Sequence, residues 1–190
     1  MTEIKRETKE TNIVLKLDMK TKGKCNIITG IGFFDHMLES FCKHSLIDLE
    51  LDCKGDTYVD FHHSVEDVGI VIGKALYKEL YPLKDIERFA DATIVMDEAS
   101  VKCSIDLSNR PFLVYDVPIF GKIGDFDAEL IEEFFRALVF NASINAHIIK
   151  ERGSNKHHIA EAAFKSFAIS LRRALKKNQK TGIPSTKGVL

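Results

Sequence analysis

Four of the seven histidines in this sequence stand in two adjacent pairs, and a glutamate follows each pair. The six residues of these two His-His-x-x-Glu motifs are His62, His63, Glu66, His157, His158 and Glu161. On a helix, positions three and four apart share a face, so each glutamate can join one histidine of its pair while the other points about 100° away. Ligands aimed in two directions suit two metal ions better than one, and imidazole with carboxylate favours Mn, Fe or Zn. The motifs therefore predict a site with two metal centres.

The two motifs occupy matching positions when the sequence is divided into halves. A single copy is more often a helix turn with exposed histidines. However, HHSVED (62–67) and HHIAEA (157–162) lie 95 residues apart, and two matched copies favour the metal site. When residues 36–41 are aligned with 133–138, His36 coincides with Glu133. Each half therefore offers a further potential ligand at the same place.

Several other residues can bind an anion or move a proton. An arginine binds phosphate through two hydrogen bonds, and serine with lysine adds a hydroxyl donor and a positive charge. The candidates for an anion site are Arg88, Arg110, Ser185, Thr186 and Lys187, although each alone is more often a solvated surface residue. Lys165 shares a predicted helix face with Glu161 and His158 and can reach a site there, or it can simply extend into solvent. His44 follows a helix end, where it can equally act as a cap, and His147 is expected to be an ordinary sheet residue.

Hydrophobic periodicity predicts the elements that must position these residues. Alternating apolar residues predict strands at 12–19, 25–28, 47–53, 94–107, 112–117 and 144–148. A period of 3.6 predicts helices at 33–43, 62–81, 127–141 and 157–177, followed by a tail or loop at 181–190. The pattern predicts an α+β fold of duplicated β-β-α-β-α units, with a mainly antiparallel sheet and its helices on one face. We expect a single domain, 1–190, with halves at about 1–88 and 89–190.

Composition excludes several classes of protein. The 190 residues include 27 basic and 28 acidic side chains, and this balance gives no electrostatic footprint for nucleic acid or an anionic membrane. The longest strongly apolar run, 68–72, is too short to span a bilayer, and the first residues lack the apolar segment of a secretory signal. The four cysteines form no CxxC pair, which favours reduced cytosolic thiols. We expect a cytoplasmic protein without a nucleic-acid or membrane partner.

Ordered motifs through nearly the whole chain resemble those of the imidazoleglycerol-phosphate dehydratase family. The motifs are Arg6-x-Thr8-x-Glu10-Thr11, TGIGFFDHML (29–38), GDTYVDFHHSVEDVGIVIG (55–73), Met96-Asp97-Glu98, SNRP (108–111), EEFFRA (132–137), GSNKHHIAEAAFK (153–165) and PSTKG (184–188). The resemblance implies a ribosomal protein S5 domain 2-like fold. It also implies a hydro-lyase of L-histidine biosynthesis that converts D-erythro-imidazole glycerol phosphate to imidazole acetol phosphate.

The resemblance further implies roles for individual residues. The ligands expected to hold two Mn²⁺ ions per site are His36, His62, His63, Glu66, Glu133, His157, His158 and Glu161. The expected substrate contacts are Glu10, His36, His44, His62, Arg88, Arg110, His157, Lys165, Ser185, Thr186 and Lys187, with the arginines and the tail on the phosphate. Family members assemble as 24-subunit shells whose sites are shared between neighbouring chains. Glu133 stands where many members carry a metal-binding histidine, and Ser40, Ala90 and Asn109 also depart from common family residues.

A mechanistic hypothesis follows from this resemblance. Metals on both ring nitrogens would hold the substrate as an imidazolate, which expels the C3 hydroxyl to give a diazafulvene-like intermediate. Loss of the C2 proton then gives an enol, with Glu161 or Glu10 as the candidate base and Lys165 helping to move protons. The ligands alone leave two alternatives open. A dinuclear metallohydrolase would be distinguished by its products, and a structural metal-binding assembly protein would show no saturable binding of a phosphorylated imidazole.

Overall fold

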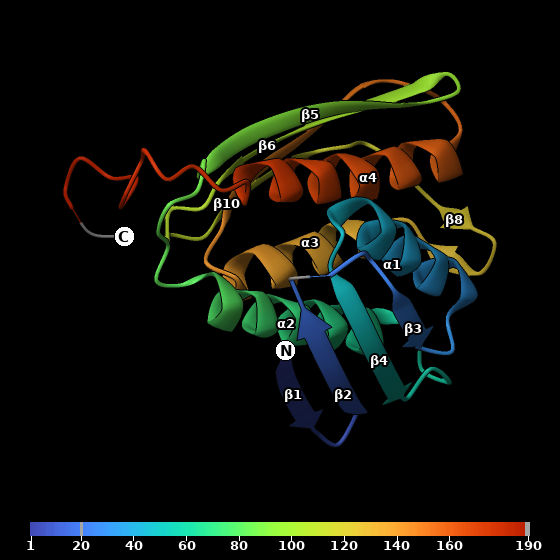
Figure 1. Cartoon of the computed structure of the whole chain (residues 1–190). Helices are drawn as coiled ribbons and strands as arrows, with labels where there is room; N and C mark the ends of the chain where they lie inside the picture. The colour runs from blue at the N-terminus through green and yellow to red at the C-terminus, as the bar shows by residue number, and fades with distance from the viewer. Residues whose placement is uncertain (20, 189–190) are drawn as a thin grey trace.

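Two four-stranded sheets enclose four helices in the part of the chain that the computed structural model describes, residues 1–19 and 21–188 (Figure 1). Within these residues, no helix combines the length and the apolar character that crossing a membrane requires. The predicted terminal segment runs to residue 190, and its last two positions lie outside the described residues.

The first half of the chain forms one sheet and two helices. Its elements are β1 Thr2–Glu7, β2 Thr11–Asp18, β3 Cys25–Ile28, α1 Gly32–Ser45, β4 Asp48–Gly55 and α2 His62–Leu80. The strand order is β1-β2-β4-β3, with β3 parallel to β4 and the other neighbours antiparallel. Along β2, the buried residues Ile13, Leu15 and Leu17 alternate with more exposed ones, as expected of a strand with one face on a core.

The second half repeats this arrangement. Its elements are β5 Phe89–Met96, β6 Ala99–Asp106, β7 Phe112–Asp116, β8 Lys122–Ile123, β9 Phe126–Asp127, α3 Leu130–Asn141, β10 Asn145–Arg152 and α4 Lys156–Ala174. The strand order is β5-β6-β10-β7, with β7 parallel to β10. Helices α1 and α2 pack on the first sheet and α3 and α4 on the second, while α1 contacts α4 and α2 contacts α3.

The strand registers of the two sheets are equivalent. Leu15 lies opposite Leu51 in the first sheet, and Cys103 lies opposite Ile148 in the second. A shift of 88 positions carries Leu15 onto Cys103, and a shift of 97 carries Leu51 onto Ile148. The longer shift reflects the β8–β9 hairpin, which lies between β7 and α3. This repeat confirms the predicted internally duplicated α+β fold. We propose that residues 1–190 form one domain whose halves divide near residue 88, since the 88-residue shift carries β1 onto β5.

The structure contains strands that the sequence pattern did not predict. The first half has three strands before its first helix, because β1 is an additional edge strand. The second half has five, because the predicted strand 94–107 is a hairpin of β5 and β6, and β8 and β9 form a further hairpin. β1 carries little apolar alternation, since only Ile4 among its six residues is a large aliphatic side chain. Within each half, the helices cover one face of a mainly antiparallel sheet, as predicted.

Close helix contacts fix the directions in which the site residues point. A Cβ atom on Gly69 of α2 would lie 2.8 Å from the Phe134 carbonyl oxygen, and one on Gly73 would lie 2.6 Å from that of Leu138. These contacts require α2 and α3 to cross at glycines. In α4 the same shift that matches the histidine pairs places Phe164 where α2 has Gly69, and Phe164 stacks on Phe134 with ring centroids 5.1 Å apart.

Candidate metal centre

Three side chains from α1 and α4 converge at the start of α4. Potential ligand atoms of His36, His157 and Glu161 all lie within 4.8 Å of one another. The Glu161 Oε2 atom lies 3.4 Å from His157 Nε2 and 3.8 Å from His36 Nε2. Two imidazole nitrogens and a carboxylate oxygen at this spacing can hold a divalent transition metal. Among the described residues, this is the cluster whose geometry suits a metal ion.

The N-terminus of α4 is built to present His157. The Asn155 side-chain oxygen accepts hydrogen bonds from the backbone N–H groups of His157 and His158, at 2.9 and 3.4 Å, and so caps the helix. The Phe33 ring packs edge-on against His157, with centroids 5.4 Å apart, and Phe126 from β9 packs behind Phe33 at 5.1 Å. Among the described residues, only the second half contains this β8–β9 hairpin. Through Phe126 and Phe33, the hairpin supports His157, a candidate metal ligand.

Lys165 controls the charge of Glu161. Its Nζ atom lies 2.7 Å from Glu161 Oε1, one helical turn away. Burial alone would raise the pKa of Glu161, but the hydrogen bond and charge of Lys165, with His36 and His157 nearby, hold that pKa below its ordinary value. Burial lowers the pKa of His44, and the positive charge of Lys165 lowers it further. The contact between α1 and α4 therefore contains an ionised carboxylate at neutral pH.

The corresponding residues of the first half are not brought together in the same way. His62 Nε2 lies 3.7 Å from Glu66 Oε2, as the helical spacing predicts. Glu133, however, pairs with the Arg136 Nε atom of its own helix at 3.7 Å. Within residues 1–19 and 21–188, Glu133 forms no compact cluster with His62 and Glu66. Its role as a ligand stays a prediction.

The second histidine of each pair contacts carboxylates of neighbouring loops. His158 Nδ1 lies 2.7 Å from Glu98, and His63 Nδ1 lies 3.1 Å from both oxygens of Asp56. These hydrogen bonds raise the pKa of both histidines, and the bond from His158 lowers the pKa of Glu98 to about 2. Glu10, in the β1–β2 turn, lies 3.7 Å from His63 Nε2. Sequence reasoning did not assign roles to Asp56 and Glu98, although both lie within motifs that carry the family resemblance.

The five predicted anion-binding residues line one open pocket together with Ser108 and Asn109. The Arg88 guanidinium is largely buried and donates to both carboxylate oxygens of Asp106, at 2.7 and 3.2 Å, and to the Pro184 carbonyl at 2.5 Å. It also stacks 4.5 Å above the exposed Phe89 ring. This network fixes one arginine and joins the C-terminal segment to the second sheet.

This anion pocket lies far from the metal cluster of the same chain. The Arg88 N–H donates to the carbonyl of Ala174, at the last turn of α4, whereas Glu161 lies 13 positions earlier in that helix. At 1.5 Å per residue, the two positions are about 20 Å apart along the helix axis. Figure 1 shows the C-terminal segment leaving from the end of α4 that is remote from β8. Arg88 also points to the outer face of the second sheet, where Phe89 and Asp106 are register partners.

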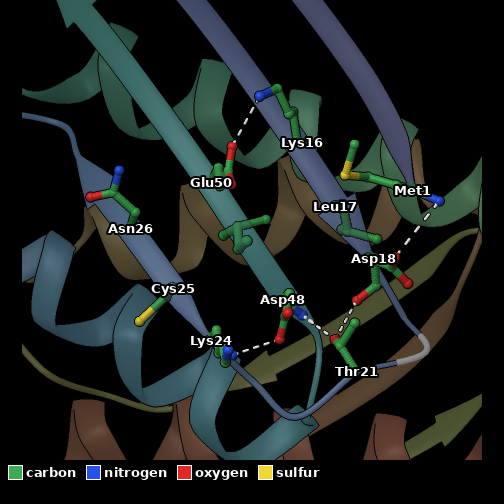
Figure 2. Close-up of a pocket in the computed structure, with 11 residues that line it drawn as sticks. Met1, Lys16, Leu17, Asp18, Thr21, Lys24, Cys25, Asn26, Asp48 and Glu50 are labelled. Carbon is green, nitrogen blue, oxygen red and sulfur yellow. Dashed lines mark hydrogen bonds and ion pairs between the residues drawn. The ribbon is translucent and has the colours of Figure 1, made fainter.

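A further pocket lies on the first sheet, away from both groups (Figure 2). Its polar groups bind one another. Asp48 Oδ1 accepts from the Lys24 N–H at 2.6 Å, the Asp48 N–H donates to Thr21 at 3.0 Å, and Lys16 pairs with Glu50 at 3.0 Å. None of the histidine motifs contributes to this pocket among its lining residues.

Comparison with known proteins agrees with the geometry. The family profile described as imidazoleglycerol-phosphate dehydratase matches residues 29–171. The chain is 65% identical to an imidazoleglycerol-phosphate dehydratase of a Nitratiruptor species and 64% identical to one of a Sulfurovum species, over the full length of all three proteins.

Two crystal structures are also similar. The enzyme from Staphylococcus aureus has a TM-score of 0.82 at 38% identity, with 93% of this chain and 100% of that chain covered. The enzyme from Pyrococcus furiosus, in complex with (S)-C348, has a TM-score of 0.85 at 37% identity, with 98% and 100% covered. The chain therefore belongs to the imidazoleglycerol-phosphate dehydratase family, the hydro-lyases that remove water from imidazoleglycerol phosphate in histidine biosynthesis.

Proposed function

We propose that this chain converts D-erythro-imidazole glycerol phosphate to imidazole acetol phosphate at a site that holds two Mn²⁺ ions. The observation that carries the proposal is the cluster of His36, His157 and Glu161, whose ligand atoms lie within 4.8 Å of one another. Nitrogen and oxygen donors without a thiolate fit Mn²⁺. His62, Glu66 and Glu133 would hold the second ion at the equivalent position of the first half, with His63 and His158 as further ligands.

The bound ions would act as Lewis acids that hold the substrate ring as an imidazolate and so favour loss of the neighbouring hydroxyl. The chain's own residues would move the protons. Glu161 is ionised next to Lys165, so it can accept a proton at Oε1 while Lys165 returns one. Glu10 is the alternative base, supplied by the β1–β2 turn beside His63. His44, near the end of α1, would contact the substrate.

Binding the phosphate requires residues of another chain. The substrate joins its ring and phosphate through three carbons, a span of about 10 Å at about 1.5 Å per bond. The anion pocket and the metal cluster of one chain are separated by about 20 Å along α4, and they lie on different sides of the second sheet. We infer that Arg88, Arg110 and residues 185–187 clamp the phosphate of a substrate bound at a neighbouring chain's metal centre.

Such sharing makes the oligomer part of the active site. A closed symmetric assembly lets every chain give one part of a site and receive another. Tyr58 is 90% exposed and Val59 57% exposed in the loop that leads into His62, so this loop presents apolar surface next to the ligands. Our proposal is the 24-subunit shell of the family, located in the cytoplasm, where the four free cysteines would stay reduced.

The test is a substrate-dependent assay for imidazole acetol phosphate with metal-free protein, before and after addition of Mn²⁺. We expect turnover only with metal, and full activity without metal would refute the proposal. Glu161→Gln should lose turnover while substrate binding persists, whereas Glu39→Gln, on the exposed side of α1, should keep the wild-type rate. An unchanged rate in Glu161→Gln would exclude Glu161 as an acid–base group.

A further inference from the structure

Glu98 makes three contacts that join the β5–β6 turn to the start of α4. Its Oε1 atom accepts the backbone N–H groups of Ser154, at 3.1 Å, and Asn155, at 2.8 Å. Its Oε2 atom lies 2.7 Å from His158 Nδ1. Two fixed N–H donors therefore determine the orientation of the carboxylate, and the second oxygen faces one nitrogen of the imidazole.

We infer that Glu98 is a positioning residue that sets the tautomer of His158. This inference rests on the proposed function, in which His158 binds a metal ion. A carboxylate can only accept a hydrogen bond, so it keeps the imidazole proton on Nδ1. The lone pair is then on Nε2, the nitrogen on the side of the ring away from Glu98. Outer carboxylates of this kind orient metal-binding histidines and increase their basicity.

The first half provides an internal comparison. Asp56 is the carboxylate that contacts His63 Nδ1, but both of its oxygens lie at the same distance of 3.1 Å. Within the described residues, no backbone N–H donates to the Asp56 side chain. An amide at position 56 could therefore turn its oxygen toward His63 and preserve the tautomer. An amide at position 98 cannot do so without losing its two backbone donors.

Glu98→Gln is accordingly a sharp perturbation. The backbone N–H groups of Ser154 and Asn155 require the amide oxygen at the Oε1 position, which leaves the NH₂ group facing His158 Nδ1. An NH₂ group donates to Nδ1 and thereby moves the imidazole proton to Nε2, so that this nitrogen can no longer bind metal. Glu98→Ala removes the constraint and lets His158 adopt either tautomer.

The experiment is a Mn²⁺ titration of metal-free protein, with free Mn²⁺ measured by its electron paramagnetic resonance signal. Wild type should take up two Mn²⁺ ions per chain. In Glu98→Gln we expect one of the two ions to bind at least about tenfold more weakly, because changing an outer carboxylate that orients a metal-binding histidine typically costs about 10–100-fold in metal affinity. The Mn²⁺ affinities of Asp56→Asn and of the exposed control Glu50→Gln should stay well within this tenfold range of wild type, because neither change forces a donor onto a histidine nitrogen, and the affinity of Glu98→Ala should fall between.

If Glu98 had a purely structural role, Glu98→Ala should bind Mn²⁺ more weakly than Glu98→Gln, the opposite of the order expected here. Glutamine keeps the shape of glutamate and an acceptor for the two backbone N–H groups. Our inference therefore predicts that Glu98→Gln has a higher melting temperature than Glu98→Ala and yet binds Mn²⁺ more weakly. Equal Mn²⁺ affinity in Glu98→Gln and wild type, or weaker binding in Glu98→Ala than in Glu98→Gln, would overturn the inference alone. Absence of Mn²⁺ uptake by wild type would overturn the proposed function as well.

Discussion

Replacing Lys165 by methionine removes the ammonium group that lies 2.7 Å from Glu161 Oε1. The two side chains are only 19% and 10% exposed, so water screens the loss much less than at a surface pair. Removing one partner of a buried ion pair lowers the free energy of unfolding by about 3–5 kcal/mol. For Lys165→Met we expect a loss at the lower end of this range, because His36 and His157 still face the Glu161 carboxylate. For a chain of this size, about 3 kcal/mol corresponds to a melting temperature about 6–12 °C lower at pH 7.

The sign of the pH dependence follows from the pKa of Glu161. That pKa is below its ordinary value in the wild type, so its contribution to stability is present at neutral pH and is lost as the pH falls through the lowered pKa. Without Lys165, burial raises the pKa of Glu161, and protonation relieves the variant at mildly acidic pH. The gap between wild type and Lys165→Met should therefore narrow as the pH is lowered from 7.

Thermal unfolding of the metal-free proteins, followed by circular dichroism, measures this gap. Lys102→Met is the matched control, because Lys102 is exposed on β6. Mn²⁺ should reduce the difference between wild type and Lys165→Met, since a bound cation provides Glu161 with a new counter-charge. Equal melting temperatures of Lys165→Met and Lys102→Met would refute the reasoning, as would a gap that is the same with and without Mn²⁺.

Two further predictions concern the anion pocket and the helix contact. Arg88→Lys loses the bidentate bond to Asp106, so steady-state kinetics should show a KM for the phosphorylated substrate raised about tenfold with a much smaller change in kcat. A lower kcat at unchanged KM would contradict a role in phosphate binding. Gly73→Ala places a Cβ atom 2.6 Å from the Leu138 carbonyl oxygen and should cost about 1–3 kcal/mol in the free energy of unfolding. Gly32→Ala, where a Cβ meets nothing within 4 Å, should change it little, and equal losses in a denaturant titration would exclude the close contact as the cause.

The helices and the histidine motifs they carry could be predicted because their signals are local. Apolar residues at helical spacing located α2 and α4, and each His-His-x-x-Glu motif lies within its first turns. The duplication was visible in the same motifs. Strand β1 gave no such signal, because at the edge of the sheet its inner face is only partly buried and carries Ile4 as its single large aliphatic side chain.

The contacts that complete the site could not be predicted, because they join residues far apart in sequence. His158 and Glu98 are separated by 60 positions and meet only because the β5–β6 turn lies over the start of α4. The motifs also gave no information about how far apart the metal cluster and the anion pocket lie in the folded chain. Arg88 and Glu161 were assigned to one substrate, but the length of α4 places them about 20 Å apart. The packed structure gives this separation, which supports the proposal that a neighbouring chain contributes the phosphate-binding residues.

Subunit complementation tests the shared site most directly. His157→Ala damages the metal cluster and Arg110→Ala damages the anion pocket, so each variant alone should have little activity. The metal-free variants are then mixed and reassembled with Mn²⁺. If a site takes its metal cluster and its anion pocket from different chains, it is intact when the metal cluster comes from an Arg110→Ala chain and the anion pocket from a His157→Ala chain. Random mixing then restores about a quarter of the wild-type rate of imidazole acetol phosphate formation. If both parts came from one chain, the mixture would be no more active than the separate variants, and the account would be contradicted.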